Sequence, residues 1–440
     1  MSNVSDFLKR AYPSIIIILA ILLGGTTKQG IWTDSLIHIL MIPAVVIGIT
    51  FLFSNKLDAV TRGLVVLVFA LLFLQFLPVQ PDRGLPEPDL LNNVWSVWSS
   101  TLSRSLNSAV AMIAALGFFL YLATLSRERI EPLIRIVFIG VALQVLITII
   151  QLSYSTKIEI SGLLPYTIRM GTFQNENHFA SLSYLVIPLL AWRFLHMKWN
   201  PIAYGLSGLI LVFLQLAVGS RSGMVLSGGL FLFSLAWVFV LKRSLTTKFI
   251  TLAVAGAIIA FMVLTQDLSD YVDDDLRELY ISGALNIAKE NWLTGTGLSS
   301  YFLIWPIFET TSVLGEKYTT HVHSDHVELF MELGISYFVL LLAFVLLILR
   351  NAFKTPLTQA ATIAIFALIL HALVDYHLRT TAISTIFAFL VALILTSQSH
   401  MDEAANYDDQ IRNKKKIRKK VKVRKTDTAV RMNNANRNGA

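Results

Sequence analysis

Three histidines and an aspartate stand close together in the second half of the chain, at His321, His323, Asp325 and His326. Imidazole and carboxylate groups are ligands of zinc. Imidazole, with a reference pKa near ~6.5, is also a natural general base at neutral pH. The segment therefore predicts a catalytic histidine, a metal site or a local surface cluster, and His323 is the preferred catalytic residue.

From Thr320 to His326 the segment reads T-H-x-H-x-D-H, the zinc signature of metallo-β-lactamase-like hydrolases. Those hydrolases gather further ligands along a soluble αβ sandwich, whereas an apolar run follows directly here. The chain has no cysteine, which excludes disulfides and thiolate ligands. The context favours a general base over zinc, so we expect no metal ligand and no cofactor.

Two other segments place an arginine among small polar residues. In the first, Arg169 precedes Asn175, Asn177 and His178, whose side chains suit hydrogen bonding to a saccharide or a phosphate. In the second, Arg221 stands in Gly-Ser-Arg-Ser-Gly between two apolar runs with almost no loop. An ionisable side chain at membrane depth is expensive, and a guanidinium matches the geometry of a phosphate. The alternative for each arginine is a snorkelling anchor at the lipid headgroups.

A fourth segment contains Gly295 and Gly297, followed by Tyr301. Two glycines at this spacing are too few to predict a phosphate-binding loop. They indicate a tight turn or a close approach of the backbone to a substrate.

The remaining sequence predicts the scaffold that must hold these residues. Hydrophobic residues make up 55% of the 440 and charged residues 15%, against roughly 25% charged in a soluble domain. Apolar runs long enough for the ~30 Å hydrocarbon core recur along the chain. We predict an all-α polytopic membrane protein of about twelve transmembrane helices. The predicted spans are 13–27, 36–53, 63–79, 107–124, 132–151, 179–195, 201–218, 222–241, 247–265, 328–349, 357–376 and 380–397.

The basic residues predict how these helices are oriented. Most lysines and arginines fall on connections that share a side with the N-terminus, and a basic run lies in the tail 401–440. Because cytoplasmic connections are rich in Lys and Arg, both termini are predicted to be cytoplasmic. The tail is predicted to be disordered beside anionic lipid, which is favoured over binding to RNA or a protein. Lys9 and Arg10 precede an apolar run without a small-residue cleavage site, so we expect a retained first helix.

The outward face then carries the longer connections, of which 266–327, between the ninth and tenth helices, is the largest. Function concentrates in long loops. Within this loop, seven residues fall on one apolar stripe of a helix, after an acidic first turn at 273–275. We expect a helix on the outer membrane face or capping a cavity. The stripe consists of Leu276, Leu279, Tyr280, Gly283, Ala284, Ile287 and Ala288.

In order and spacing, these segments resemble the O-antigen ligase and polysaccharide polymerase superfamily of bacterial membrane glycosyltransferases. That pattern has an Arg before G-T-F-x-N-x-N-x-x-A, then S-R, then an Arg and G-x-G, then H-N-x-x-L-x-x-x-x-E-x-G. Ser324 replaces the usual Asn, Val327 the usual Leu, and Trp292 stands near the usual Pro. The resemblance covers about 165–340 of a membrane domain at 1–400. The matching residues are Arg169, Gly171, Thr172, Phe173, Asn175, Asn177, Ala180, Ser220, Arg221, Arg277, Gly295, Gly297, His323, Glu332 and Gly334.

The resemblance implies an inverting, metal-independent transfer of a glycan from an undecaprenyl pyrophosphate carrier to an acceptor hydroxyl. The reaction would take place at the outer face of the bacterial cytoplasmic membrane. His323 would be the catalytic base. The residues expected to bind pyrophosphate or glycan are Arg169, Arg221, Arg277, Asn175, Asn177, Gly297 and Glu332.

The implied partners are the lipid-linked oligosaccharide, an acceptor glycan or glycolipid, and membrane lipids, with a chain-length regulator protein as a further candidate and no nucleic acid. A repeat-unit polymerase is favoured over a ligase that transfers the glycan to lipid A core. This preference rests on the segment His371 to Arg379, which resembles exopolysaccharide polymerases. A lipid-linked saccharide flippase remains an alternative of another class, although no internal repeat of the transporter type is found.

Overall fold

The structure, a computed structural model, describes residues 11–28, 30–54, 56–79, 81, 97–153, 164–165, 170–196, 200–235, 275–308 and 319–396. Several features of the sequence analysis lie outside these residues. They are Lys9, Arg10, Arg169, the acidic residues Asp273 and Asp274, the apolar span 247–265 and the basic tail 401–440.

The described residues fold almost entirely into helices. The β-type pairing among them is an isolated bridge between Met170 and Phe173. The helices of the N-terminal half are α2 (Tyr12–Leu23), α3 (Trp32–Leu52), α4 (Ala59–Leu74), α6 (Leu102–Ala123), α7 (Arg127–Ile130), α8 (Leu133–Ser153), α9 (Glu176–Leu185), α10 (Ile187–His196), α11 (Pro201–Val218) and α12 (Arg221–Leu235). Those of the C-terminal half are α14 (Asp275–Glu290), α15 (Tyr301–Phe308), α16 (Asp325–Leu333), α17 (Ile335–Ala352), α18 (Pro356–His371), the short 3₁₀ helix η3 (His377–Arg379) and a last helix, Thr381–Thr396.

Within the described part of the chain, five helical segments are long and apolar enough to cross a membrane, judged by length and composition. They are Trp32–Leu52, Leu102–Ala123, Arg127–Ser153, Glu176–Leu195 and Ile335–Ala352. Shorter apolar helices include α2, α4, α11, α12, α18 and Thr381–Thr396. The prediction of an all-α, multi-pass membrane protein is confirmed, and the count of about twelve spans stays a prediction.

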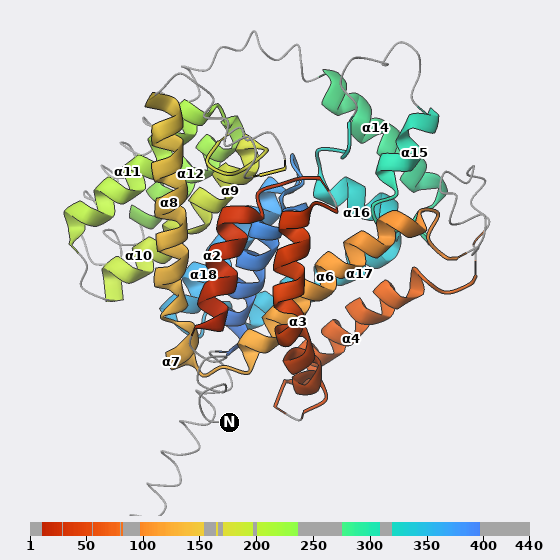
Figure 1. The fold of residues 1–440 in the computed structure, drawn as a ribbon, viewed down its shortest axis with the longest axis horizontal. Helices are drawn as coiled ribbons and strands as arrows, with labels where there is room; N and C mark the ends of the chain where they lie inside the picture. Colours follow the sequence, from red (N-terminus) through yellow and green to blue (C-terminus); the bar gives the residue numbers. More distant parts are fainter. Residues whose placement is uncertain are drawn as a thin grey trace, which may run out of the picture.

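Figure 1 shows two groups of helices on either side of α2 and α18. The helices α8 to α12 lie on one side, and α4, α6 and α17 lie on the other. Beyond the end of the second group, α14 and α15 lie near α16. The apolar stripe of α14 packs there, because Tyr280, Ala284 and Ile287 form a buried cluster with Trp305 of α15 and Met331 of α16. The stripe is therefore buried largely against protein.

Two predicted spans are each divided into two helices. The span 328–349 breaks at Gly334, whose φ of 60° lies in the left-handed region. A side chain there would meet the Trp292 carbonyl oxygen at 2.7 Å, which only glycine avoids. The span 179–195 breaks at Val186, just before Pro188, which lacks the N–H needed to continue the helical hydrogen bonds. Because of the break at Gly334, α16 is a separate short helix that begins in the histidine segment and ends beside the turn at Gly295.

Candidate active site

His323 lies beside a buried carboxylate that comes from a distant part of the chain. Its Nδ1 is 3.8 Å from Oδ1 of Asp375, and its side chain is 26% exposed. At 61°, the φ of His323 lies in the left-handed region, an uncommon conformation for a residue with a side chain. Strained backbone of this kind concentrates at functional sites. Because Nδ1 faces Asp375, Nε2 is the ring nitrogen that remains for a substrate.

The carboxylate of Asp375 is held in place from several directions. Its Oδ1 accepts the backbone N–H of Tyr376 at 2.9 Å. The Tyr376 ring packs edge-on to His323, at 5.1 Å between centroids. Burial alone would raise the pKa of Asp375, but the neighbouring imidazoles, first that of His323, hold it well below its usual range. An ionised carboxylate can orient an imidazole and stabilise the imidazolium formed when the ring takes a proton.

Two further histidines adjoin the same carboxylate. Nε2 of His178 is 3.9 Å from Oδ1 of Asp375, and the rings of His178 and His377 are 5.3 Å apart. We call Asp375, His178, His323 and His377 the Asp375 cluster. It joins α9, the loop before α16 and the segment before the last helix.

The other members of the T-H-x-H-x-D-H string point to separate partners. Nδ1 of His321 lies 2.9 Å from Oε1 of Glu328. His326 contacts the Tyr337 hydroxyl and the Ile369 carbonyl oxygen. Asp325 faces Arg379, with 3.6 Å between Oδ1 and Nε. Within the described ranges these side chains do not converge on one point, which argues against the hydrolase-type zinc site.

Arg379 lies among three buried carboxylates, which together we call the Arg379 cluster. Besides Asp325, its guanidinium is 3.2 Å from Glu328 and 2.9 Å from Glu332. All three belong to α16, which lies outside the candidate spans. Burial raises the pKa of Glu332 to about 8 and that of Asp325 to about 7. Although burial also opposes its ionisation, Arg379 and His321 lower the pKa of Glu328 to about 2. The negative charge that balances the guanidinium of Arg379 therefore lies mainly on Glu328.

The asparagine and arginine segments meet at the start of α9 and α12. Asn175 caps α9 by accepting the backbone N–H of Asn177 at 2.8 Å. Oδ1 of Asn177 accepts from the Ser220 hydroxyl at 2.7 Å. Ser220 in turn accepts the N–H of Gly223 at 3.2 Å, which places Arg221, half-buried, at the first turn of α12. The following residue, Ser222, lies 2.7 Å from Nε2 of His371, five residues before Tyr376.

The turn just before α9 is held by two glutamines on one face of α8. Gln144 donates to the Thr172 hydroxyl and accepts its backbone N–H, at 2.6 and 2.9 Å. Gln151 pairs with both the N–H and the carbonyl of Gly171, at 2.8 and 2.9 Å. Irregular backbone at membrane depth needs such partners. The glycine and threonine of this motif thus serve to position Asn175.

Of the remaining predicted site residues, Gly297 and Glu332 contact each other, and Arg277 lies on a separate helix. Arg277 is exposed on α14, near enough to His371 for its charge to act on that imidazole. Gly297 has a φ of 102°, and its N–H donates to the Glu332 carbonyl at 2.9 Å, as expected of a tight turn. The Glu332 side chain is fully buried against Arg379. Substrate contacts for these three, and for Arg169, stay predictions.

The sequence alone indicates no individual role for Asp375, Tyr376, His377 or Arg379, although the segment that contains them resembles exopolysaccharide polymerases. The available signal is a group of ionisable residues at the end of one predicted span and just before the next. They are His371, Asp375, His377 and Arg379. His178 was grouped with Asn175 and Asn177 as a hydrogen-bonding surface, and its ring instead points into the protein interior, where it is fully buried.

A family comparison bears on this geometry. Residues 206–342 match the family model Wzy_C, described as O-antigen ligase. This match supports a likeness to the O-antigen ligase superfamily over that part of the chain. Its members are membrane glycosyltransferases, so the match supports an enzyme of that general type. The matched segment contains Arg221, Arg277 and His323 and ends before Asp375. A comparison with curated proteins found no match.

Proposed function

We propose that the protein polymerises lipid-linked repeat units, transferring a glycan from undecaprenyl pyrophosphate to a sugar hydroxyl of an acceptor chain. The observation that carries this proposal is the pairing of His323 with Asp375 in a chain that matches the O-antigen ligase model over residues 206–342. A partly exposed imidazole backed by a buried carboxylate is suited to removing a proton from a hydroxyl group.

The proposed reaction is a single displacement. Nε2 of His323 takes the proton from the acceptor hydroxyl, whose oxygen bonds to the anomeric carbon of the donor sugar. The bond from that carbon to the pyrophosphate oxygen breaks, so the anomeric configuration inverts. Negative charge develops on the departing pyrophosphate, which Arg221, together with Arg169 and Arg277, would stabilise. Such a reaction consumes no nucleotide and needs no metal ion.

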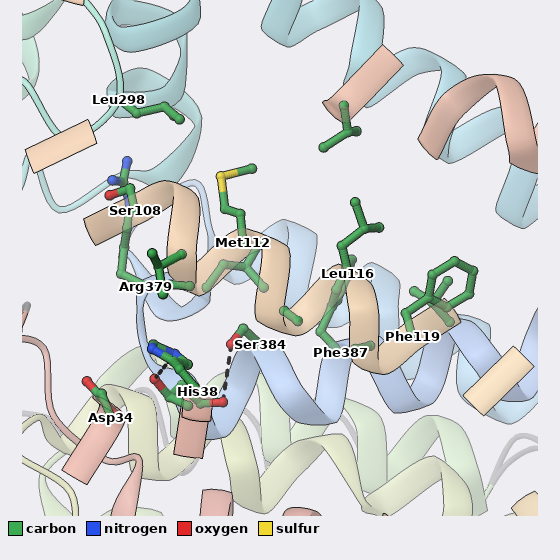
Figure 2. Close-up of a pocket in the computed structure, with 18 of the residues that line it drawn as sticks. Asp34, His38, Ser108, Met112, Leu116, Phe119, Leu298, Arg379, Ser384 and Phe387 are labelled. Atoms are coloured by element: carbon green, nitrogen blue, oxygen red, sulfur yellow. Dashed lines mark hydrogen bonds between the residues drawn. The ribbon is translucent and has the colours of Figure 1, made fainter. Parts of the chain in front are cut away.

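An apolar groove in the structure supports the proposal that the donor is lipid-linked. It has a volume of about 580 Å³ and lies among α3, α4, α6, α17 and the last helix. Figure 2 shows Met112, Leu116 and Phe119 of α6 along its length, opposite Phe387 of the last helix.

The groove ends in polar groups, which include Arg379 and Ser108. Asp325, two residues after His323, also lines it. A volume in the range of ordinary ligand pockets, ~300–1,000 Å³, suits part of a polyprenyl chain, with the remainder among the bilayer lipids. We propose that the lipid occupies the apolar length.

A ligase that attaches glycan to lipid A core is the second candidate, favoured by the description of the matching family. A strain deleted for the gene distinguishes the two. Single unpolymerised repeats would support the polymerase, whereas finished polymer left on the carrier lipid would support the ligase. Normal polymer with normal attachment would contradict both.

The proposed outer-face location is tested by labelling introduced cysteines in intact cells. Glu278, exposed on α14, is placed outside, and Lys56, exposed between α3 and α4, is placed in the cytoplasm. Glu278→Cys should react with an impermeant thiol reagent, and Lys56→Cys should react only after permeabilisation. The reverse result would overturn the orientation.

A further inference from the structure

The Asp375 cluster holds four buried side-chain atoms that have no hydrogen-bond partner among the described residues. One is Nδ1 of His323, and the other three are Nε2 of His178, Nε2 of His377 and Oδ2 of Asp375. His178, His377 and Asp375 are fully buried. Because an unpaired buried polar atom costs free energy, three such atoms in one cluster mark a candidate binding site for an ion.

His178, Asp375 and His377 have the donor atoms of a metal site and lie close to the spacing that such a site needs. One ligand atom from each lies within 4.8 Å of the other two. Tetrahedral zinc, with bonds of ~2.0–2.2 Å, needs its ligand atoms ~3.3–3.6 Å apart. A small inward movement of the side chains would therefore complete the site. Two imidazoles and one carboxylate suit a divalent transition metal of the zinc type and not magnesium or calcium, which require oxygen ligands.

Hydrogen bonds on the opposite ring nitrogens fix the orientation of both imidazoles. Nδ1 of His178 lies 2.5 Å from the Thr380 hydroxyl, and Nδ1 of His377 lies 3.0 Å from the Ser181 hydroxyl. Metal-binding histidines are characteristically held in this way. The neighbouring His371 differs, because Ser222 engages its Nε2 while Ser181 and Tyr184 engage its Nδ1. His371 therefore offers no nitrogen to an ion.

We propose that His178, Asp375 and His377 bind a divalent transition-metal ion of the zinc class. Asp375 is also the carboxylate beside His323. An ion on Asp375 withdraws that negative charge from His323 and leaves the imidazole without its orienting partner. Occupancy therefore inhibits the transferase, a consequence that rests on the function proposed above.

Metal binding is tested first, without reference to activity. The full-length protein in lipid nanodiscs, stripped with chelator, is titrated with Zn²⁺, and binding is followed by calorimetry and metal analysis. We expect one site, with two imidazole nitrogens and one carboxylate oxygen in the zinc X-ray absorption spectrum. Mg²⁺ should not compete. The proposal is overturned if the wild-type protein binds no zinc, or if the spectrum lacks two imidazole ligands.

Substitutions then test which residues bind the ion. His377→Ala and Asp375→Asn should abolish this site, while Ser181→Ala, which frees the His377 ring, should weaken it ~10- to 100-fold. His326→Gln is the matched control, because both ring nitrogens of His326 are already engaged, and it should bind zinc like the wild type. Unchanged zinc affinity in His377→Ala and Asp375→Asn would overturn the assignment.

Inhibition is tested separately with a lipid-linked donor. Zinc should lower transfer by the wild type in proportion to occupancy, and excess chelator should restore it. Zinc that binds without slowing transfer would overturn the inhibitory role and leave the site intact. Binding without any transferase activity under all conditions would count against the proposed function instead.

Discussion

The Arg379 cluster and the Asp375 cluster are both buried groups of ionisable side chains, and both draw on the segment that follows α18. In the first, a permanent cation lies within 3.6 Å of three carboxylates. In the second, one carboxylate adjoins three imidazoles, and among the described residues no arginine or lysine forms an ion pair with it. A guanidinium stays charged at all relevant pH values, whereas an imidazole can gain or lose a proton. The first cluster therefore suits a structural role and the second suits proton transfer.

Among substitutions in the Asp375 cluster, His323→Ala should cause the largest loss of transferase activity. Removal of a general base lowers turnover by ~10²- to 10⁴-fold. Donor binding and thermal stability should change little, because the side chain is partly exposed and has no strong hydrogen bond. Steady-state transfer kinetics and a melting curve check both parts. Turnover near that of the wild type would remove His323 from the catalytic role.

Among substitutions in the Arg379 cluster, Arg379→Met should cause the largest loss of stability. Breaking a buried ion pair by removing one partner costs ~3–5 kcal/mol, because the carboxylates stay buried without their cation. Thermal and denaturant unfolding in detergent would measure this loss. Arg350→Met is the matched control, since its bond to Asp58 is exposed and should contribute at most ~1 kcal/mol. Equal losses of unfolding free energy in Arg379→Met and Arg350→Met would contradict a special structural role for the buried Arg379 cluster.

Arg221→Lys separates pyrophosphate binding from simple anchoring. Lysine keeps the charge but loses the planar fork that binds phosphate oxygens in pairs, so donor affinity and turnover should both fall. If Arg221 only anchors α12 at the lipid headgroups, lysine should serve equally well. Arg193→Lys, on α10, is the control and should leave transfer unchanged. Wild-type kinetics in Arg221→Lys would support the anchoring role.

The smallest expected effect concerns the proton held by the Arg379 cluster. The pKa of Glu332 is about 8 in the fold, against an ordinary value of ~4.3 in an unfolded chain. Between these values the folded protein binds the extra proton, so its stability should fall as the pH rises through this interval. Glu332→Gln removes this contribution and should show a shallower decline in melting temperature from pH 6 to 8.5. An equally steep decline would mean that Glu332 is ionised in the fold.

The positions of the helices along the chain could largely be predicted from the sequence. Which helices and loops pack against one another could not. Apolar length predicts α11 as 201–218, as observed. It does not predict that the segment after α18 packs against α9 and the His323 loop, because hydrophobic periodicity carries no information on helix order in space. For this reason Asp375 was missed, while His323, which lies in a recognisable motif, was found. Gly334 divides one predicted span through a local backbone requirement that hydropathy does not register.

A double-mutant cycle on the purified transferase tests the central claim most directly, namely that His323 and Asp375 act as one unit in glycan transfer. Transfer from a lipid-linked donor is measured in chelator for the wild type, His323→Ala, Asp375→Asn and the double variant. Residues that act as a unit are strongly non-additive. We expect Asp375→Asn alone to be severely impaired and the double variant to be no slower than His323→Ala. Full activity in Asp375→Asn, or losses that multiply in the double variant, would contradict it.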